Sequence, residues 1–295
     1  MIRKIVLIYC IMLVTHFAWS QVPVSQVYLF DLQSLADGHT VVHTPRLLTS
    51  FNNAGYNNQP FFKNENELYL TVQIPQEGES DIHLFNLITR TRQRITFTPK
   101  SEYSPVVTPD KKYISCVRVD DAASATQRLY KYENKPRGQE ISVLPDIKNV
   151  GYHTWLDDKT VALFLVATPN QLAIVDIESR DPLIFTSDIG RCLASTDKGH
   201  LIYVHKISSE FWYIKEYDPV TQRASIITET VPGSEDFAIT ADGHFIMGAG
   251  SKLFVYKPGV DTSWKEIADL KYFGINAITR LAVNGKNLAL VNLSK

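Results

Sequence analysis

Six short polar segments recur along this chain and hold the side chains best suited to binding or chemistry. Each segment directly precedes a short apolar one. The six are Tyr56-Asn-Asn-Gln59, Glu102-Tyr-Ser104, Gly151-Tyr-His153, Arg191-Cys192, Ser234-Glu-Asp236 and Thr279-Arg280. Together they supply carboxylates, guanidinium groups, phenols, amides and an imidazole. These groups suit hydrogen bonding and ion pairing with a polar ligand.

If the fold brings these segments together, they form one binding site for a peptide, a loop of a partner protein or a small polar ligand. Loops displayed by a rigid scaffold often carry function. The alternative is that these are solvated loop residues with only local hydrogen bonds. The candidate binding residues are Tyr56, Asn58, Gln59, Glu102, Tyr103, Tyr152, His153, Arg191, Glu235, Asp236 and Arg280.

Motifs for catalysis or metal binding do not stand out in the sequence. No Gly-x-Ser-x-Gly segment is present, so a nucleophile elbow of the hydrolase type is absent. The histidines do not pair with Cys, Asp or Glu at ligand spacing, and His153 is the best single candidate. A lone histidine more often forms hydrogen bonds than binds a metal. We therefore predict no catalytic residues, no metal site and no cofactor.

The polar segments must be positioned by the strands that follow them. The opening strands begin at Pro60, Pro105, Thr154, Leu193, Phe237 and Leu281, about 40–50 residues apart, which is the period of propeller blades. Turn residues such as Thr108-Pro-Asp-Lys111 and Thr240-Ala-Asp-Gly243 follow, and then a dense apolar strand such as Tyr113–Val117. Third strands and more polar fourth strands complete each repeat. The pattern predicts blades of four antiparallel strands.

The last repeat lacks its third and fourth strands, and the first residues of the fold supply them. Val27–Leu32 reads as a third strand and Pro45–Thr49 as a fourth. We therefore predict an all-β fold, a six-bladed β-propeller closed by N- and C-terminal strands that share one blade. A β-sandwich or several small β modules is the alternative, but the long period and the split blade favour the propeller.

The first residues have the pattern of a secretory signal. Arg3 and Lys4 precede an apolar run from Ile5 to Val14, and Ala18-Trp-Ser20 offers small residues for cleavage. The prediction is a signal peptide at residues 1–20 and a single propeller domain at 21–295, in a periplasmic or secreted protein without stable membrane insertion. The formal net charge of −1 gives no electrostatic reason to expect nucleic-acid binding. Cys116 and Cys192 are expected to be buried thiols.

Several repeats resemble the TolB-like, WD40-like propeller family. The segments that carry the resemblance are Gln59-Pro-Phe-Phe62, Ser104-Pro-Val-Val-Thr-Pro-Asp-Lys-Lys-Tyr-Ile114, Ile174-Val-Asp176, Arg94-Ile-Thr96 and Thr240-Ala-Asp-Gly-His-Phe-Ile246. The resemblance covers the propeller portion only. It implies a periplasmic protein that binds a protein or peptide partner of the cell envelope at the mouth of its channel, and we expect a monomer.

Two functional hypotheses follow. The favoured one is an exported, non-catalytic propeller that binds a protein or peptide at the channel mouth. The alternative is an extracytoplasmic enzyme or small-ligand binder of the lactonase, lyase or glycan-acting type, with groups from several blades around an axial metal. Metal analysis of the purified protein separates the two, because a tightly bound stoichiometric metal favours the second.

Overall fold

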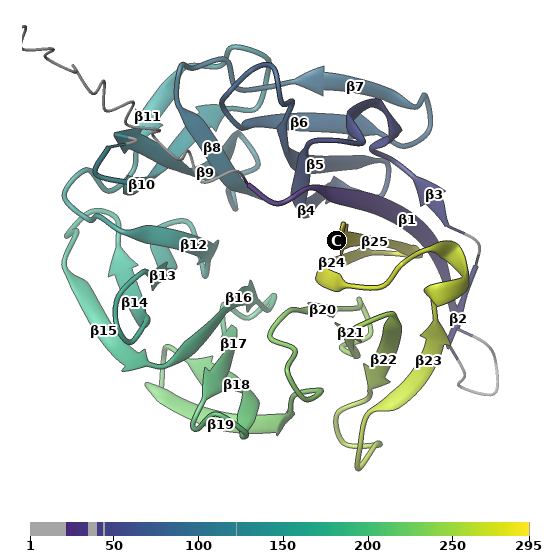
Figure 1. The fold of residues 1–295 in the computed structure, drawn as a ribbon. Coiled ribbons are helices and arrows are strands. Elements are labelled where there is room, and N and C mark those ends of the chain that lie inside the picture. Colours follow the sequence, from purple (N-terminus) through teal and green to yellow (C-terminus); the bar gives the residue numbers. More distant parts are fainter. Residues whose placement is uncertain (1–21, 35–39, 44, 122, 295) are drawn as a thin grey trace, which may run out of the picture.

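The computed structural model describes residues 22–34, 40–43, 45–121 and 123–294. The predicted signal peptide at residues 1–20 lies outside this part of the chain. The described residues form six antiparallel sheets around one central axis (Figure 1). The predicted six-bladed propeller is therefore confirmed. None of the described helices is long and apolar enough to cross a membrane.

Five blades are built from consecutive strands, ordered from the axis outward. Blade 1 holds β4 (Tyr56–Asn64), β5 (Glu67–Gln73), β6 (Asp81–Asn86) and β7 (Thr91–Arg94). Blade 2 holds β8 (Ser101–Val107), β9 (Tyr113–Asp121), β10 (Thr126–Glu133) and β11 (Glu140–Ser142). Blade 3 holds β12 (Val150–Trp155), β13 (Thr160–Leu165), β14 (Gln171–Asp176) and β15 (Pro182–Ser187). Blade 4 holds β16 (Ile189–Ser195), β17 (Leu201–Lys206), β18 (Trp212–Asp218) and β19 (Arg223–Glu229). Blade 5 holds β20 (Phe237–Ile239), β21 (Phe245–Ala249), β22 (Lys252–Tyr256) and β23 (Lys265–Asp269).

Blade 6 joins the two ends of the described chain. Its inner strands are β24 (Ile278–Asn284) and β25 (Asn287–Leu293), and β1 (Ser25–Ser34) pairs antiparallel with β25 from Ser25↔Leu293 to Asp31↔Asn287. The outer position is shared by two short strands that both pair with β1, namely β2 (Thr40–Val42) and β3 (Arg46–Leu47). The predicted closure by terminal strands is confirmed. Helical turns η1 (Ser50–Asn52) and η2 (Lys271–Phe273) lie in connections between blades.

The hydrophobic core lies between neighbouring blades rather than at the axis. Each second strand is apolar at consecutive positions because both of its faces pack against other blades. In β5, for example, Leu68, Tyr69 and Leu70 are all fully buried. At one such interface, side chains of blades 1 and 2 pack together, and they are Tyr69, Ile82, Ile95, Ile114, Cys116 and Tyr132.

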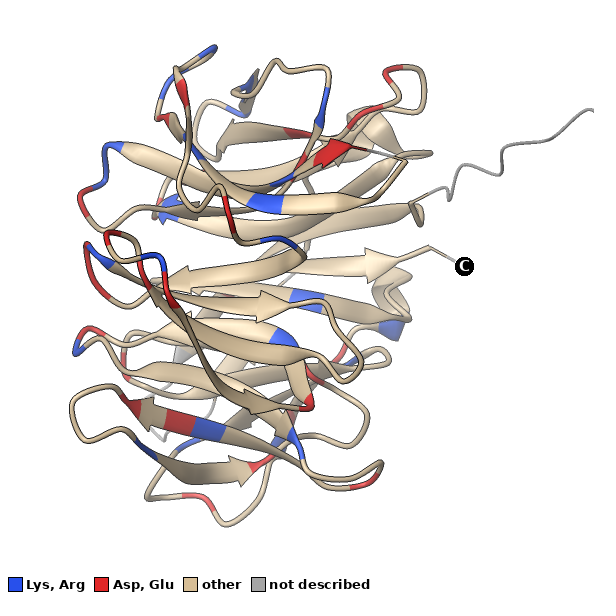
Figure 2. Ribbon diagram, turned by 90° about the vertical axis from the view of Figure 1, so that its left-hand side faces the viewer, with Lys and Arg blue, Asp and Glu red and all other residues tan. Residues whose placement is uncertain are grey.

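All six innermost strands run in the same direction, so they all begin at one face of the ring. We call that end of the central channel the channel mouth. The C-terminus lies on this face, because β25 ends where β24 begins. The turns that follow the innermost strands, such as residues 110–112 and 157–159, lie on the opposite face. Figure 2 shows acidic and basic residues on the loops at both faces of the ring.

Candidate functional site: the channel mouth

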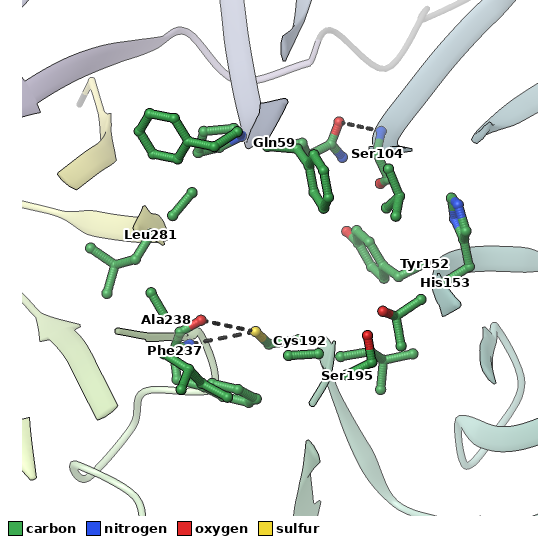
Figure 3. A pocket seen from close by; sticks show the side chains of 18 of the residues that line it. Gln59, Ser104, Tyr152, His153, Cys192, Ser195, Phe237, Ala238 and Leu281 are labelled. Atoms are coloured by element: carbon green, nitrogen blue, oxygen red, sulfur yellow. Dashed lines mark hydrogen bonds between the residues drawn. The ribbon is translucent and has the colours of Figure 1, made fainter. Parts of the chain in front are cut away.

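The innermost strands of all six blades surround a cavity of about 730 Å³ (Figure 3). This volume is within the range of about 300–1,000 Å³ that is typical of small-ligand pockets. Residues of β4, β8, β12, β16, β20 and β24 line it. Polar residues gather where the strands begin, whereas apolar residues such as Leu281 and Ala238 follow deeper along the strands.

Bulges at the start of the inner strands direct side chains toward the axis. The pairing register shifts between Asn58 and Phe61 in β4 and between Tyr103 and Val106 in β8. Similar shifts occur in β12, β16 and β24. In β4 and β8 the bulge places Gln59 (φ 53°) and Ser104 (φ 55°) in the left-handed region. A bulge turns the local side chains away from the regular alternation, so each of these five strands can present a residue to the mouth.

Asp236 binds two arginines from the blades on either side of it. Arg191 of β16 donates from Nε to Asp236 Oδ2 at 2.9 Å, and Arg280 of β24 donates from Nη1 to Asp236 Oδ1 at 3.1 Å. Arg191 also donates from Nη2 to the Thr279 carbonyl at 2.9 Å. Burial opposes the charge of Arg280, but the Asp236 carboxylate acts together with Tyr152, Tyr56 and Cys192 to raise the pKa of Arg280 above its ordinary value. Blades 4, 5 and 6 are thus joined by ion pairs at the mouth.

A second carboxylate extends this network. Glu235 Oε2 lies 2.7 Å from Lys206 Nζ and accepts from the Arg191 backbone N–H at 3.3 Å. Burial acts to raise the pKa of Glu235, but Lys206 and Arg191 together hold it below its ordinary value. Glu235 is therefore ionised at neutral pH. We call Arg191, Lys206, Glu235, Asp236 and Arg280 the mouth cluster.

Three tyrosines, from blades 1, 2 and 3, lie near the start of the inner strands, and one of them contacts the mouth cluster. The Arg280 guanidinium lies 4.6 Å from the centre of the Tyr152 ring, a cation–π contact. Tyr152 points into the cavity from β12 (Figure 3). The Tyr56 and Tyr103 rings pack edge to face, with centroids 6.2 Å apart. Burial raises the pKa of Tyr56 above its ordinary value, so its hydroxyl stays protonated.

Eight of the eleven predicted site residues lie at or beside the mouth. These are Tyr56, Gln59, Tyr103, Tyr152, Arg191, Glu235, Asp236 and Arg280. Gln59 Oε1 accepts the backbone N–H of Ser104 at 3.0 Å, which links β4 to β8 (Figure 3).

The other three predicted residues are placed differently. Glu102 is fully buried between blades 1 and 2, where it accepts hydrogen bonds from Thr98 and Tyr132. It precedes Tyr103 in β8, and adjacent residues of a strand point to opposite faces. Asn58 is buried, and its Oδ1 accepts the Gln59 backbone N–H at 2.7 Å.

His153 borders the cavity but is engaged with the neighbouring blade. Its Nε2 lies 2.7 Å from Ser115 Oγ, which donates to the Val106 carbonyl and accepts from Trp155. The Ser115 hydroxyl proton is already used, so His153 Nε2 is the donor. Burial lowers the pKa of His153 to about 3, which keeps the ring neutral.

Cys192 forms a contact between blades 4 and 5. Its Sγ donates to the Phe237 carbonyl at 3.3 Å and accepts from the Phe237 backbone N–H at 3.5 Å (Figure 3). Burial raises the pKa of this thiol to about 12. A protonated, hydrogen-bonded thiol is a poor nucleophile. Among the described residues, no group of three or more His, Cys, Asp or Glu side chains is arranged to hold a metal.

Comparisons with known proteins bear on the fold. No protein-family model matches this sequence. No curated protein matches it either. Solved structures do match: a putative TolB from Agrobacterium tumefaciens has a TM-score of 0.67 at 10% identity, covering 93% of this chain and 99% of that one. TolB from Acinetobacter baumannii has a TM-score of 0.57 at 14% identity, covering 92% of this chain and 64% of that one.

The fold is that of a TolB-like propeller. This chain spans less than two thirds of the A. baumannii TolB. A puromycin-hydrolyzing peptidase from Mycobacterium tuberculosis also matches, with a TM-score of 0.53 at 13% identity over 81% of this chain and 42% of that one. At such identities the likeness shows the fold alone.

Sequence reasoning missed Lys206 in this TolB-like propeller. Lys206 is the last residue of β17, the second strand of blade 4. Because β17 pairs antiparallel with β16, its end lies beside the start of β16, with Ile189 opposite His205. The residue that ends a second strand is therefore also a candidate for the channel mouth, together with the residues that begin the first strands. A single lysine carries no motif, so only the topology could have identified it.

Replacing Asp236 with asparagine will destabilise the TolB-like propeller by about 2 kcal/mol, because hydrogen bonds to charged groups contribute about 1.5–3 kcal/mol. Asparagine can still accept a hydrogen bond through one oxygen, but its amide N–H₂ faces the other arginine. The measurement is urea unfolding at pH 7. Asp158→Asn, on an exposed turn of the opposite face, is the matched control and will change stability by less than about 0.5 kcal/mol. Equal effects of the two variants would show that Asp236 does not hold the arginines.

Proposed function

We propose that this protein is an exported, non-catalytic β-propeller that binds a protein or peptide partner at the channel mouth. The observation that carries the proposal is the convergence of Tyr152, Arg191, Asp236 and Arg280, which come from four neighbouring blades, around one cavity. Tyrosine and arginine are the residue types that dominate protein-binding hot spots. The TolB-like fold is consistent with an envelope protein of this kind.

Exposed apolar side chains beside the mouth support a protein partner. Ile207 and Phe211, in the hairpin that follows Lys206, are 55% and 50% exposed. On the same face, Tyr272 in η2 is 93% exposed. Apolar residues next to a polar, partly desolvated cluster resemble the arrangement of a protein-binding surface.

Site-specific photo-crosslinking in the native host tests this proposal. A benzophenone amino acid placed at Phe211 or Tyr272 is expected to form a discrete crosslinked product with one envelope protein. The matched control is Val220, which is 88% exposed in the turn between β18 and β19 on the opposite face. The same product from Val220, or none from both mouth positions, would contradict the proposal.

A further inference from the structure

The mouth cluster contains more hydrogen-bond donors than acceptors. Arg280 has five N–H groups, and among the described residues only Nη1 has an acceptor, Asp236 Oδ1. Its Nε–H and Nη2–H₂ groups are left to donate. Asp236 Oδ2 accepts both of its hydrogen bonds from Arg191. Neither oxygen of Asp236 accepts from Nε or Nη2 of Arg280, so Asp236 leaves these donors of Arg280 free.

The charges of the cluster are also unequal. Arg191, Arg280 and Lys206 face the carboxylates of Asp236 and Glu235, and each carboxylate is in contact with two of these cations. The ion-paired cluster thus carries excess positive charge. In a partly desolvated site this charge favours an anion over a cation or a neutral ligand.

Uncharged side chains add further hydrogen-bond donors that have no acceptor in the part of the chain that the structure describes. Among the described residues, the hydroxyls of Tyr152 and Tyr56 form no hydrogen bond with another side chain or with the backbone, although their rings make aromatic and cation–π contacts. Gln59 uses its Oε1 to accept from Ser104, which leaves its Nε2–H₂ without a described partner. Tyr152 and Gln59 both line the cavity.

We propose that the channel mouth holds a subsite for a carboxylate, with Arg280 as the principal ligand-binding residue and Tyr152 and Gln59 as neutral donors. The Arg280 guanidinium lies 4.6 Å from the centre of the Tyr152 ring, and its Nε–H and one Nη2–H lie along one edge, so they can donate two parallel hydrogen bonds. A planar carboxylate matches that geometry.

This inference rests on the proposed function, since the carboxylate belongs to the segment of the partner that enters the mouth. Either an acidic side chain or a free C-terminus supplies the same chemistry, and the cavity of about 730 Å³ admits a few residues of an extended peptide.

The test is a ligand-observed NMR titration of the purified full chain with short defined probes. Acetyl-Gly-Glu-Gly-amide presents a side-chain carboxylate, acetyl-Gly-Gly-Gly presents a C-terminal one, and acetyl-Gly-Gln-Gly-amide is the neutral match. We expect at least one carboxylate probe to bind about tenfold or more tightly than the neutral one, because hydrogen bonds to charged groups are the strong ones. Binding of the first probe would indicate an acidic side chain as the natural ligand, and binding of the second would indicate a free C-terminus.

Variants test the role of Arg280. Arg280→Gln is expected to weaken carboxylate binding about tenfold or more, and Arg280→Lys to weaken it less, since lysine keeps the charge but cannot bind in a bidentate manner. Arg223→Gln, at the exposed start of β19, is the control and is expected to bind as the unchanged protein does. Thermal unfolding of each variant verifies its fold.

The outcomes separate this inference from the proposed function. Equal binding of the neutral and acidic probes, or unchanged binding to a folded Arg280→Lys and Arg280→Gln pair, overturns the carboxylate subsite. Binding of inorganic sulfate without binding of either carboxylate probe also overturns it. Crosslinking at the mouth without carboxylate binding would support the proposed function and contradict the carboxylate subsite. Carboxylate binding without crosslinking would support the subsite and contradict binding of a protein partner.

Discussion

Replacing Leu290 with aspartate will prevent this protein from forming a stable closed ring. Leu290 is fully buried in β25, opposite Leu281 of β24 on one side and Tyr28 of β1 on the other. It packs in a hydrophobic cluster that includes Phe30, Ile246 and Leu253, so it joins blade 6 to blade 5. Leu290 therefore stabilises both the shared blade and its contact with a neighbour.

The expected loss is comparable with the whole stability of a domain. Leu→Ala in a core costs about 2–5 kcal/mol, and an unpaired buried carboxylate adds several kcal/mol more. Native domains are stable by only about 5–15 kcal/mol. Far-UV circular dichroism, gel filtration and urea unfolding measure the effect, and we expect loss of the cooperative transition or a midpoint shifted far toward zero urea.

Ile226→Asp is the matched control for this experiment. Ile226 also lies in a strand, the outer strand β19, but it is 56% exposed. Its neighbour across the strand pair is Lys215, which can accommodate a carboxylate. This variant is expected to stay within about 1 kcal/mol of the unchanged protein. If Leu290→Asp were equally mild, closure by β25 would not be a major source of stability.

The propeller could be predicted because the same sequence pattern recurs in each blade. Turn residues such as Asp110 and Gly243 recur between apolar strands at a regular spacing, and each repeat supports the reading of the others. The split blade was predictable for the same reason, since Val27–Leu32 supplies what the last repeat lacks. The division of the outer position between β2 and β3 could not be foreseen, because strands of three and two residues leave only a weak pattern in the sequence.

The site was predictable only as a region. The start of each inner strand had to lie at one face, and the structure brings Arg191, Asp236 and Arg280 into contact there. The direction of an individual side chain depends on the bulges, and a shift of one residue reverses which face it points to. For this reason Glu102 could not be separated from Tyr103 by sequence alone.

Glu102 provides the second large effect. It is fully buried between blades 1 and 2, and its Oε1 accepts hydrogen bonds from the hydroxyls of Thr98 and Tyr132. Its Oε2 has no partner among the described residues. Burial raises the pKa of Glu102 to about 7, and although the Thr98 hydrogen bond opposes this, the nearby Asp81 carboxylate adds to it.

The sign of the resulting pH dependence follows from the raised pKa. The folded protein holds the Glu102 proton more tightly than the unfolded chain does, so the contribution of Glu102 to stability is complete below about pH 4.5. It is lost as the pH rises toward and through about 7. A shift of this size corresponds to about 3 kcal/mol at 1.36 kcal/mol per pKa unit. His83 and His153 act in the opposite direction, because burial lowers the pKa of each to about 3 and their neutral forms stabilise the fold as the pH rises.

Glu102→Gln separates the effect of the Glu102 carboxyl group on the pH dependence of stability from the effect of the histidines. Glutamine keeps an oxygen that accepts from Thr98 and Tyr132 but cannot ionise, so the variant should match the unchanged protein near pH 4.5. It should become more stable than it by about 3 kcal/mol near pH 8. Urea unfolding at intervals between these pH values measures the difference, in which the shared histidine contributions cancel. Glu229→Gln, at an exposed position of β19, should show no such trend. A difference that is flat with pH would mean that Glu102 is ionised in the folded protein, and the interface between blades 1 and 2 would then have to stabilise a buried charge.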